Sequence, residues 1–267
     1  MPHPPITLIA LDMDGTLLNH RLRIARRDAA ALREAEAHGV QIVIATGRTP
    51  EDALRYARQA RLHCHALGIN GCRNLAPTGE VVSEHFFPPE TAAKAQEILS
   101  ALKLPHAAFH PKRIVLLGPK NKIMTRFAVW NRRFGYICGA GSAEVHAVYK
   151  LFAMIEDPRD PRLEEARVLL SAIPGVEVAS SWHDNIEIMP AGVHKGAAVA
   201  ELAARLGVAP AQVMAIGDQM NDAEMLSYAG VGVAMGNAVP ELKSLARHVT
   251  GTNKEHGVAQ AIKTHVL

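Results

Sequence analysis

The sequence predicts an α/β fold in which a doubly wound, Rossmann-like parallel sheet is interrupted by a smaller inserted α+β domain. Apolar, strand-like runs alternate with helical patterns over residues 1–82, and the alternation returns over residues 191–267. Such alternation is typical of βαβ units and a parallel sheet. Residues 83–190 between them are richer in aromatic, proline and basic residues. We therefore expect the outer segments to form one core domain and the middle segment a second domain.

The first segment alternates strands and helices, with strands expected at residues 6–12, 40–47 and 65–70 and helices at 26–39 and 49–61. The second helix carries start signals, because Thr49 can cap it and Pro50 suits the first helical position. The acidic pair Glu51–Asp52 lies at the positive end of the helix dipole. The third segment continues the pattern from a helix at 195–207 into a strand at 213–218.

The middle segment has helical patterns at residues 90–103, 121–135 and 161–173, and strand-like runs at 113–118, 148–155, 176–182 and 185–190. The last two runs flank His183–Asp184, which predicts an antiparallel hairpin. His183 in this turn can point toward the entrance of a site. Trp130 and Trp182 either belong to the core of this domain or, in one case, form a wall of a ligand pocket.

Composition limits the class of protein. With 267 residues, of which 48% are hydrophobic, the chain can bury a substantial core. We expect a cytoplasmic protein without membrane association, because no run resembles a membrane span or signal peptide and the three cysteines form no framework. The net charge of +3, without a dense basic block, favours a small anionic ligand over nucleic acid. Nothing indicates an obligate protein partner.

Polar residues follow several of the expected parallel strands. Asp12 and Asp14 end the first strand, Thr46–Gly47 the second, Asn70–Gly71 the third and Gly217–Asp218 a later one. Each taken alone is an ordinary turn sequence. Because ligands bind beyond the carboxyl ends of strands in open parallel sheets, their joint placement favours a binding site at one sheet edge.

The two N-terminal aspartates indicate a metal ion. Asp12 and Asp14 would point to the same side if the strand continued through them. At about 4 Å and an effective dielectric constant near 20, their charges would repel by roughly 4 kcal/mol. A divalent cation reverses this, and a cluster of oxygen ligands suits Mg²⁺. Asp218 is the natural additional carboxylate, and one aspartate can act as a nucleophile while the other transfers protons.

Lys195 opens an expected helix, where a cation is disfavoured by about 0.3 to 1 kcal/mol. An anion should compensate for this placement, although a solvated lysine is the simpler reading. Beside a metal and phosphate, Lys195 would bind the phosphate. Thr46 and the backbone at Gly47 can bind further phosphate oxygens, since glycine lets an anion approach closely.

Four motifs together resemble the haloacid dehalogenase-like superfamily, most closely its Cof-like phosphatases. They are DMDGT at residues 12–16, TGR at 46–48, Lys195 in MPAGVHKG, and GDQMND at 217–222, in the order found in that family. Segments 66–72 and 249–262 resemble its Asn-Gly segment and C-terminal signature. The middle segment resembles the family's larger cap in position, size and α+β pattern only.

The resemblance implies roles for individual residues. Asp12 corresponds to the nucleophile, which also binds the metal, and Asp14 to the general acid and base, whose backbone carbonyl binds the metal. Asp218 corresponds to a metal ligand and Asp222 to a supporting carboxylate that orients Lys195 or water. The remaining phosphate-binding positions are Met13, Thr46, Gly47, Lys195 and Asn221. Arg48 either touches substrate or is an exposed residue at the start of a helix.

The predicted activity is Mg²⁺-dependent hydrolysis of a small phosphorylated metabolite, such as a sugar phosphate or phosphorylated cofactor, through an aspartyl-phosphate. The cap would exclude water and select the leaving group. Two alternatives stay open: phosphoryl transfer between sugar positions, as in phosphomannomutase-like relatives, and a non-catalytic regulatory module that binds a phosphorylated metabolite. The His63–Cys64–His65 run is expected to pack or face solvent, since no partner cluster completes a metal site.

Overall fold

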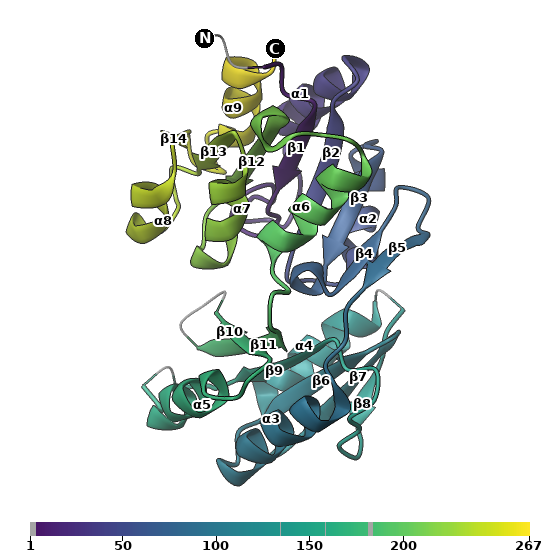
Figure 1. The fold of residues 1–267 in the computed structure, drawn as a ribbon, viewed down its shortest axis with the longest axis vertical. Coiled ribbons are helices and arrows are strands. Elements are labelled where there is room, and N and C mark those ends of the chain that lie inside the picture. The colour runs from purple at the N-terminus through teal and green to yellow at the C-terminus, as the bar shows by residue number, and fades with distance from the viewer. Residues whose placement is uncertain (1–3, 134, 158, 181–183) are drawn as a thin grey trace. The chain divides into compact units, whose positions relative to one another are not determined.

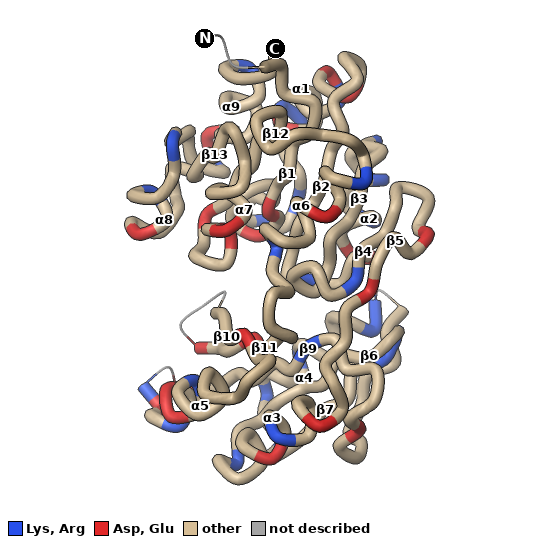
Figure 2. The backbone as a smooth tube through the Cα atoms, in the orientation of Figure 1, with Lys and Arg blue, Asp and Glu red and all other residues tan. Residues whose placement is uncertain are grey.

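The chain divides into two units. The computed structural model describes residues 4–133, 135–157, 159–180 and 184–267. The core unit comprises Met1–Glu84 and His194–Leu267, and the inserted unit comprises His85–Val193 (Figure 1). The sequence prediction puts the two boundaries after residues 82 and 190. Acidic and basic residues are interspersed along both units (Figure 2).

The core unit is built on an eight-stranded sheet with the order β14-β13-β12-β1-β2-β3-β4-β5. The strands from β14 to β3 run parallel, whereas β4 and β5 are antiparallel additions at one edge. The predicted α/β class with a parallel core sheet is confirmed. The strands are β1 (Leu8–Leu11), β2 (Gln41–Ala45), β3 (Cys64–Gly68), β4 (Arg73–Leu75), β5 (Val81–Glu84), β12 (Val213–Gly217), β13 (Val231–Ala234) and β14 (His248–Val249).

Helices cover both faces of this sheet, as the βαβ crossovers require. Helix α1 packs against α9, and α6 packs against α7, which Figure 1 shows on the face toward the viewer. Because both faces are covered, β1 is buried along its whole length and reads as a continuous apolar run. The helices are α1 (Arg26–Ala37), α2 (Pro50–Gln59), α6 (Lys195–Arg205), α7 (Ala223–Tyr228), α8 (Pro240–Leu245) and α9 (Gly257–His265), with short 3₁₀ turns at Ile69–Gly71, Pro210–Gln212 and Met220–Asp222.

The start of α2 differs from the sequence prediction. Pro50 lies at the first helical position, but the Thr49 hydroxyl makes no capping hydrogen bond. The first turn is closed instead by the backbone, with the Asp52 amide donating to the Thr49 carbonyl at 3.1 Å. Since Pro50 has no N–H, this end of the helix has one donor fewer to satisfy.

The inserted unit has a six-stranded sheet with the order β10-β11-β9-β6-β7-β8, antiparallel except for the β7 and β8 pair. The antiparallel pairing of β10 with β11 confirms the predicted hairpin. Its strands are β6 (His106–His110), β7 (Arg113–Leu117), β8 (Ile137–Ala140), β9 (Lys150–Met154), β10 (Val176–Ala179) and β11 (Asn185–Pro190), and its helices are α3 (Pro89–Ala101), α4 (Lys122–Arg132) and α5 (Pro161–Ser171).

Alternation along β9 gives the two faces of this sheet different partners. Leu151 and Ala153 join the apolar core that also contains residues of α3 and α5. The neighbouring residue Phe152 points to the other face, where its ring stacks on Phe127 of α4 at 5.1 Å.

A buried ion pair lies on this second face of the inserted sheet. Lys150 of β9 donates to Glu187 of β11 at 2.9 Å, and both side chains are less than 5% exposed. The Lys150 ammonium lies 4.8 Å from the ring centre of Phe109 and 5.5 Å from that of Phe152. One positive and one negative charge are thus buried together against aromatic rings.

Several other sequence expectations can be placed. Trp130 lies partly exposed on α4 with Arg133 over its ring, outside the buried apolar cluster of the inserted unit. Trp182 and His183 lie outside the described residues. Cys64, Cys72 and Cys138 are buried, and none of them forms a disulfide within the described residues. Among the helices of the described chain, none is both long and apolar enough to cross a membrane.

Candidate active site

Asp12 follows β1 directly, at the carboxyl edge of the parallel sheet. Its backbone amide donates to the carbonyl of Ile216 in β12 at 2.9 Å, so the ends of β1 and β12 are held together. The Asp12 side chain is buried, and its Oδ1 accepts a hydrogen bond from Lys195 Nζ at 2.6 Å. Lys195 begins α6, 183 positions later in the chain, and its side chain is 2% exposed.

Asp222 is the second partner of Lys195. Its Oδ1 accepts from Lys195 Nζ at 2.7 Å, while its Oδ2 accepts from the backbone amides of Asp218 and Gln219 at 2.9 and 3.1 Å. Both carboxylate oxygens are therefore in use, and the side chain is fully buried. Asp222 fixes the Lys195 ammonium and the turn that carries Asp218.

Asp218 follows β12 and faces Asp12. Its Oδ1 accepts from the Thr16 hydroxyl at 2.8 Å. Gly15 has a positive φ of 85°, and a Cβ atom there would overlap the Asp218 carboxylate. Glycine is required here both by the left-handed backbone and by the close approach of this side chain.

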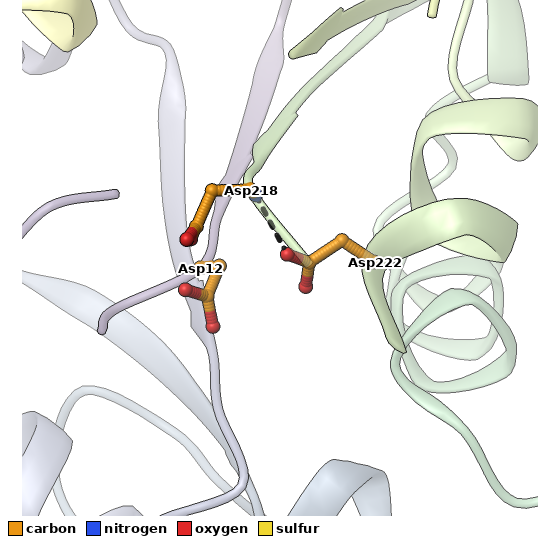
Figure 3. A group of neighbouring side chains, drawn as sticks. All are labelled: Asp12, Asp218 and Asp222. Atoms are coloured by element: carbon orange, nitrogen blue, oxygen red, sulfur yellow. Dashed lines mark hydrogen bonds between the residues drawn. The ribbon is translucent and has the colours of Figure 1, made fainter. Parts of the chain in front are cut away.

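Three carboxylates gather at this edge, and we call Asp12, Asp218 and Asp222 the aspartate cluster. Each offers an oxygen within 4.8 Å of the others, and among the described residues they form a group of side chains that could hold a metal ion. Figure 3 shows Asp12 and Asp218 at the ends of neighbouring strands and Asp222 reaching in from the following turn. His63, Cys64 and His65 are not part of this group.

The electrostatics of the cluster are unbalanced, because one lysine faces three carboxylates. Burial raises the pKa of Asp12 well above its usual range, and although Lys195 lowers it, the charges of Asp222 and Asp218 add to the rise. Burial and the charge of Asp222 raise the pKa of Asp218 to about 6. Burial lowers the pKa of Lys195, but the nearby Asp12 and Asp222 outweigh this and raise it, so Lys195 stays charged.

This donor set fits a hard divalent cation. Asp12 and Asp218 lie close together, and within the described chain the Asp218 carboxylate accepts only from the neutral side chains of Thr16 and Gln219, at 2.8 and 3.3 Å. The Asp222 carboxylate accepts from the charged Lys195 and from two backbone amides. Mg²⁺ commonly takes one or two carboxylates and completes its coordination with water and phosphate oxygen. The Asp14 side chain lies outside the aspartate cluster. A metal contact through its backbone carbonyl stays a prediction.

Asp14 is paired with Arg48 instead. Arg48 Nε donates to Asp14 Oδ2 and Nη2 donates to Oδ1, both at 2.6 Å. Arg48 Nη1 donates to Asp52 Oδ2 at 2.8 Å. Arg48 is half-buried, and Asp52 is 2% exposed. Of the two readings of Arg48, the exposed surface residue is therefore excluded by its burial and ion pairs.

The other predicted phosphate-binding residues surround the same strand ends. Thr46 follows β2 and is buried, and its hydroxyl oxygen accepts from the Arg48 amide at 3.1 Å, which leaves the hydroxyl proton for another acceptor. Gly47 lies between them. The Met13 side chain belongs to the apolar core, so only its backbone can contact an anion. The buried Oδ1 of Asn221 has no hydrogen-bond partner within the described parts of the chain.

Asn70 follows β3 in a strained turn that is tied to this loop. Ile69 and Asn70 both have a positive φ, of 54° and 57°. A positive φ is most unusual for Ile69, because its side chain is branched at Cβ. The amides of the two residues donate to the carbonyls of Arg48 and Thr46 at 2.7 and 2.9 Å. Backbone strain of this kind gathers at functional sites, where the surrounding hydrogen bonds maintain it.

A sequence profile of haloacid dehalogenase-like hydrolases matches residues 9–262 and so spans both units. The chain belongs to the haloacid dehalogenase-like hydrolase family. The resemblance carried by the four motifs is thereby confirmed, and so is the prediction of a hydrolase.

Relatives of this haloacid dehalogenase-like hydrolase match it over nearly the whole chain. A 5-amino-6-(5-phospho-D-ribitylamino)uracil phosphatase of Bacillus subtilis is 35% identical over 271 residues, covering 98% of this chain and 96% of that protein. A pyridoxal phosphate phosphatase of Escherichia coli is 30% identical over 273 residues, covering 97% and 98%. The solved structure of a haloacid dehalogenase-like hydrolase from B. subtilis has a TM-score of 0.87 at 26% identity and covers 98% of this chain and 100% of that one.

Three residues at the site carry contacts that the sequence alone did not assign. Thr16 holds Asp218, Gln219 donates to Asp218 Oδ2 at 3.3 Å, and Asp52 holds Arg48. Thr16 is a fixed part of the quoted DMDGT motif, which was a usable signal. For Asp52 the sequence indicates only a favourable place near the helix dipole, but its four-residue spacing from Arg48 is consistent with an ion pair.

Proposed function

We propose that this protein is a Mg²⁺-dependent phosphatase that hydrolyses a small phosphorylated metabolite through an aspartyl-phosphate on Asp12. The observation that carries the proposal is the charge imbalance at the sheet edge. The aspartate cluster brings three carboxylates within 4.8 Å of one another, and Lys195 contacts two of them. A phosphate dianion adds more negative charge, so a further cation is needed for it to bind beside Asp12.

Asp12 and Asp218 would hold that cation. Bound there, Mg²⁺ would neutralise charge on the transferring phosphoryl group. Thr16 and Gly15 support the arrangement, because the Thr16 hydroxyl fixes Asp218 Oδ1 and the missing side chain of Gly15 leaves room for the Asp218 carboxylate. Contacts that orient a metal ligand in this way typically affect metal affinity about 10- to 100-fold.

In the first half-reaction, a carboxylate oxygen of Asp12 attacks the phosphorus atom. The bond between phosphorus and the alcohol oxygen of the substrate breaks, and that oxygen takes a proton from Asp14. An acyl phosphate forms on Asp12. Lys195, fixed by Asp222, places a positive charge beside the attacking carboxylate and stabilises charge that develops during transfer.

In the second half-reaction, water attacks phosphorus and gives a proton to Asp14, which now acts as a base. The bond between phosphorus and the Asp12 oxygen breaks, so inorganic phosphate leaves and the Asp12 carboxylate is restored. The proton of the Thr46 hydroxyl is available to a phosphate oxygen, and Asn221 lies in the turn beside Asp222. Both contacts would orient the phosphoryl group through the two steps.

The proposed substrates are phosphate monoesters of small metabolites. Two relatives at 30% identity or more are named for such compounds, a phosphoribitylamino-uracil and pyridoxal phosphate. Each compound contains a phosphate group and a nitrogen heterocycle. We assign the selection of the alcohol to the inserted unit, acting as a cap, because the residues proposed for chemistry all come from the core unit.

The test is phosphate release from 4-nitrophenyl phosphate and from a panel of phosphorylated metabolites that includes both named compounds and several sugar phosphates. Release is expected in Mg²⁺ and not in EDTA, with free alcohol and phosphate formed in equal amounts. A folded protein that releases no phosphate from any member of the panel would contradict the proposal. Isomerised sugar phosphate without free phosphate would show a mutase instead.

A further inference from the structure

The side chain of Asp14, the proposed proton donor and acceptor, is held by a two-point contact. Nε and Nη2 of Arg48 donate to Oδ2 and Oδ1 of Asp14, each at 2.6 Å. A guanidinium that contacts both oxygens fixes the plane and the direction of a carboxylate. The Asp14 side chain is 39% exposed, so the Arg48 contact, more than packing, restrains it.

Arg48 is itself fixed by the first turns of α2. Its Nη1 donates to Asp52 Oδ2 at 2.8 Å, and the ring of Tyr56 lies 5.8 Å from its Cζ. Arg48, Asp52 and Tyr56 follow one another at four-residue spacing, which places them along one side of the chain as it enters the helix. Burial lowers the pKa of Arg48, but the hydrogen bonds and charges of Asp14 and Asp52 outweigh this and raise it, so Arg48 stays charged.

The direction of these contacts separates two roles for Arg48. An arginine that bound the transferring phosphoryl group would direct its paired donors at that group. Here Nε and Nη2 face Asp14, and Nη1 faces the buried Asp52. The Thr46 hydroxyl, two residues earlier, retains the proton that can reach a phosphate oxygen.

We propose that Arg48 is a positioning residue that orients the general acid and base Asp14, with Asp52 as its anchor, and that it does not bind the transferring phosphoryl group. This inference rests on the proposed phosphatase activity and adds a residue to its proton-transfer step. Each oxygen of Asp14 has its own Arg48 donor. One contact can therefore hold the carboxyl group through one oxygen while the other oxygen carries the proton.

The test uses phenyl phosphates that differ only in a para substituent, so that their size is matched while the basicity of the departing oxygen varies. A 4-nitrophenolate leaves without a proton, whereas a more basic phenolate needs a proton from Asp14 as it leaves. Since kcat/KM covers the steps through the first phosphoryl transfer, its slope against leaving-group pKa reports proton donation. Wild type is compared with Arg48→Ala, Arg48→Lys, Asp52→Asn and Asp14→Asn, and Arg58→Ala on the exposed side of α2 is the control.

For Arg48→Ala we expect kcat/KM to fall roughly tenfold to a hundredfold for the most basic leaving group but by less than about threefold for 4-nitrophenyl phosphate. Asp14→Asn should steepen the slope in the same way, and Asp52→Asn and Arg48→Lys by less. Inhibition by inorganic phosphate should not change in Arg48→Ala. The Arg58→Ala control should match wild type.

An equal loss for every leaving group, together with weaker inhibition by inorganic phosphate, would show that Arg48 binds the phosphoryl group and would overturn the inference. An unchanged slope in all three Arg48 and Asp52 variants would overturn it as well. Should Arg48→Ala fail to fold, Arg48→Lys and Asp52→Asn carry the same comparison. A wild-type protein without phosphatase activity would instead contradict the proposed function, which distinguishes the two failures.

Discussion

Among the described residues, the core unit and the inserted unit each bury a lysine against carboxylate groups, one in the inserted unit and two in the core unit. In the inserted unit, Lys150 pairs with Glu187 at 2.9 Å, one positive charge with one negative. In the core unit, Lys195 contacts two members of the aspartate cluster, which supplies three carboxylates. Burial of a charged lysine is therefore common to both units, and the excess of negative charge distinguishes the candidate active site.

This difference separates a buried charge that serves packing from one that indicates a binding site. A matched ion pair can be retained as part of the packing, because each charge compensates the other. A buried cluster with unmatched carboxylates is costly until a cation joins it. The two units should consequently respond in opposite ways when one carboxylate is neutralised.

The largest expected effect comes from Asp12→Asn. Because this change removes the proposed nucleophile, kcat should fall on the order of 10⁴-fold or more. The melting temperature of the metal-free protein should stay level or rise, since one of the crowded negative charges is gone. Steady-state kinetics and thermal unfolding measure the two outcomes. Mass spectrometry must exclude deamidation of the new residue, and full turnover in an intact variant would contradict the nucleophile assignment.

The matching change in the inserted unit is Glu187→Gln, for which we expect the opposite result on stability. It leaves the buried Lys150 without the carboxylate 2.9 Å away, and breaking a buried pair in this way costs about 3 to 5 kcal/mol. Denaturant unfolding measures the loss in the free energy of unfolding. Hydrogen exchange of the β9 and β11 amides then shows whether that loss lies in the inserted sheet. Glu144→Gln, in the exposed pair with Arg113, is the control and should change little. A Glu187 variant as stable as wild type would remove the contrast between the units.

A smaller effect is expected for Gly15→Ala, which adds a methyl group where the Asp218 carboxylate lies. Displacing this carboxylate should weaken Mg²⁺ binding about 10- to 100-fold. Gly39→Ala is a matched control, because Gly39 has nearly the same positive φ, 84° against 85°, but open space around its Cβ position. Calorimetric titration with Mg²⁺ compares the two. Equal affinities in both variants would show that Gly15 serves the turn alone.

The smallest expected effect is a pH trend of opposite sign in the two units. Without metal, the raised pKa of Asp218, about 6, gives stability that is present below the ordinary carboxyl pKa and lost as pH rises through 6. In the inserted unit, burial lowers the pKa values of His106 and His110, so their contribution is present above the ordinary histidine pKa and lost as pH falls through the lowered values.

Hydrogen exchange at several pH values in EDTA separates these trends, since amides of β1 and β12 report the core unit and amides of β6 the inserted one. Mg²⁺ should reverse the trend in the core unit, because protons compete with the metal for Asp218, and should leave the β6 amides unchanged. His106→Gln should weaken the acid sensitivity of β6. Parallel pH trends in both units would refute this comparison.

Much of the core unit is predictable from sequence because its signals are local and repeated. The strand ends at Asp12, Thr46 and Asp218 are adjacent through the parallel pairing of β1 with β2 and β12, and that pairing follows from the alternation of strands and helices. The unfavourable place of Lys195 at a helix start predicts an anionic partner, and Asp12 and Asp222 lie there as such partners. Fold class and family followed from these same residues.

The contacts of Asp14 and Asp222 are harder to predict from the sequence. Two residues apart on an extended strand, Asp12 and Asp14 should share one side, but the chain turns after β1 ends at Leu11 and their carboxylates have different partners. Asp222 was known as an acidic residue in a motif, yet its role as the joint partner of Lys195 and two backbone amides needs the folded turn. Rotamer and hydrogen-bond choices of this kind are set by packing, which periodicity does not contain.

The most direct test of the account is to trap the covalent intermediate. The protein is mixed with 4-nitrophenyl phosphate in Mg²⁺, quenched, and treated with borohydride, which reduces an aspartyl-phosphate to homoserine, and the peptides are then mapped by mass spectrometry. We predict homoserine at position 12, and none without Mg²⁺ or in Asp12→Asn. Phosphate release with an unmodified Asp12, or reduction at another carboxylate, would contradict the account.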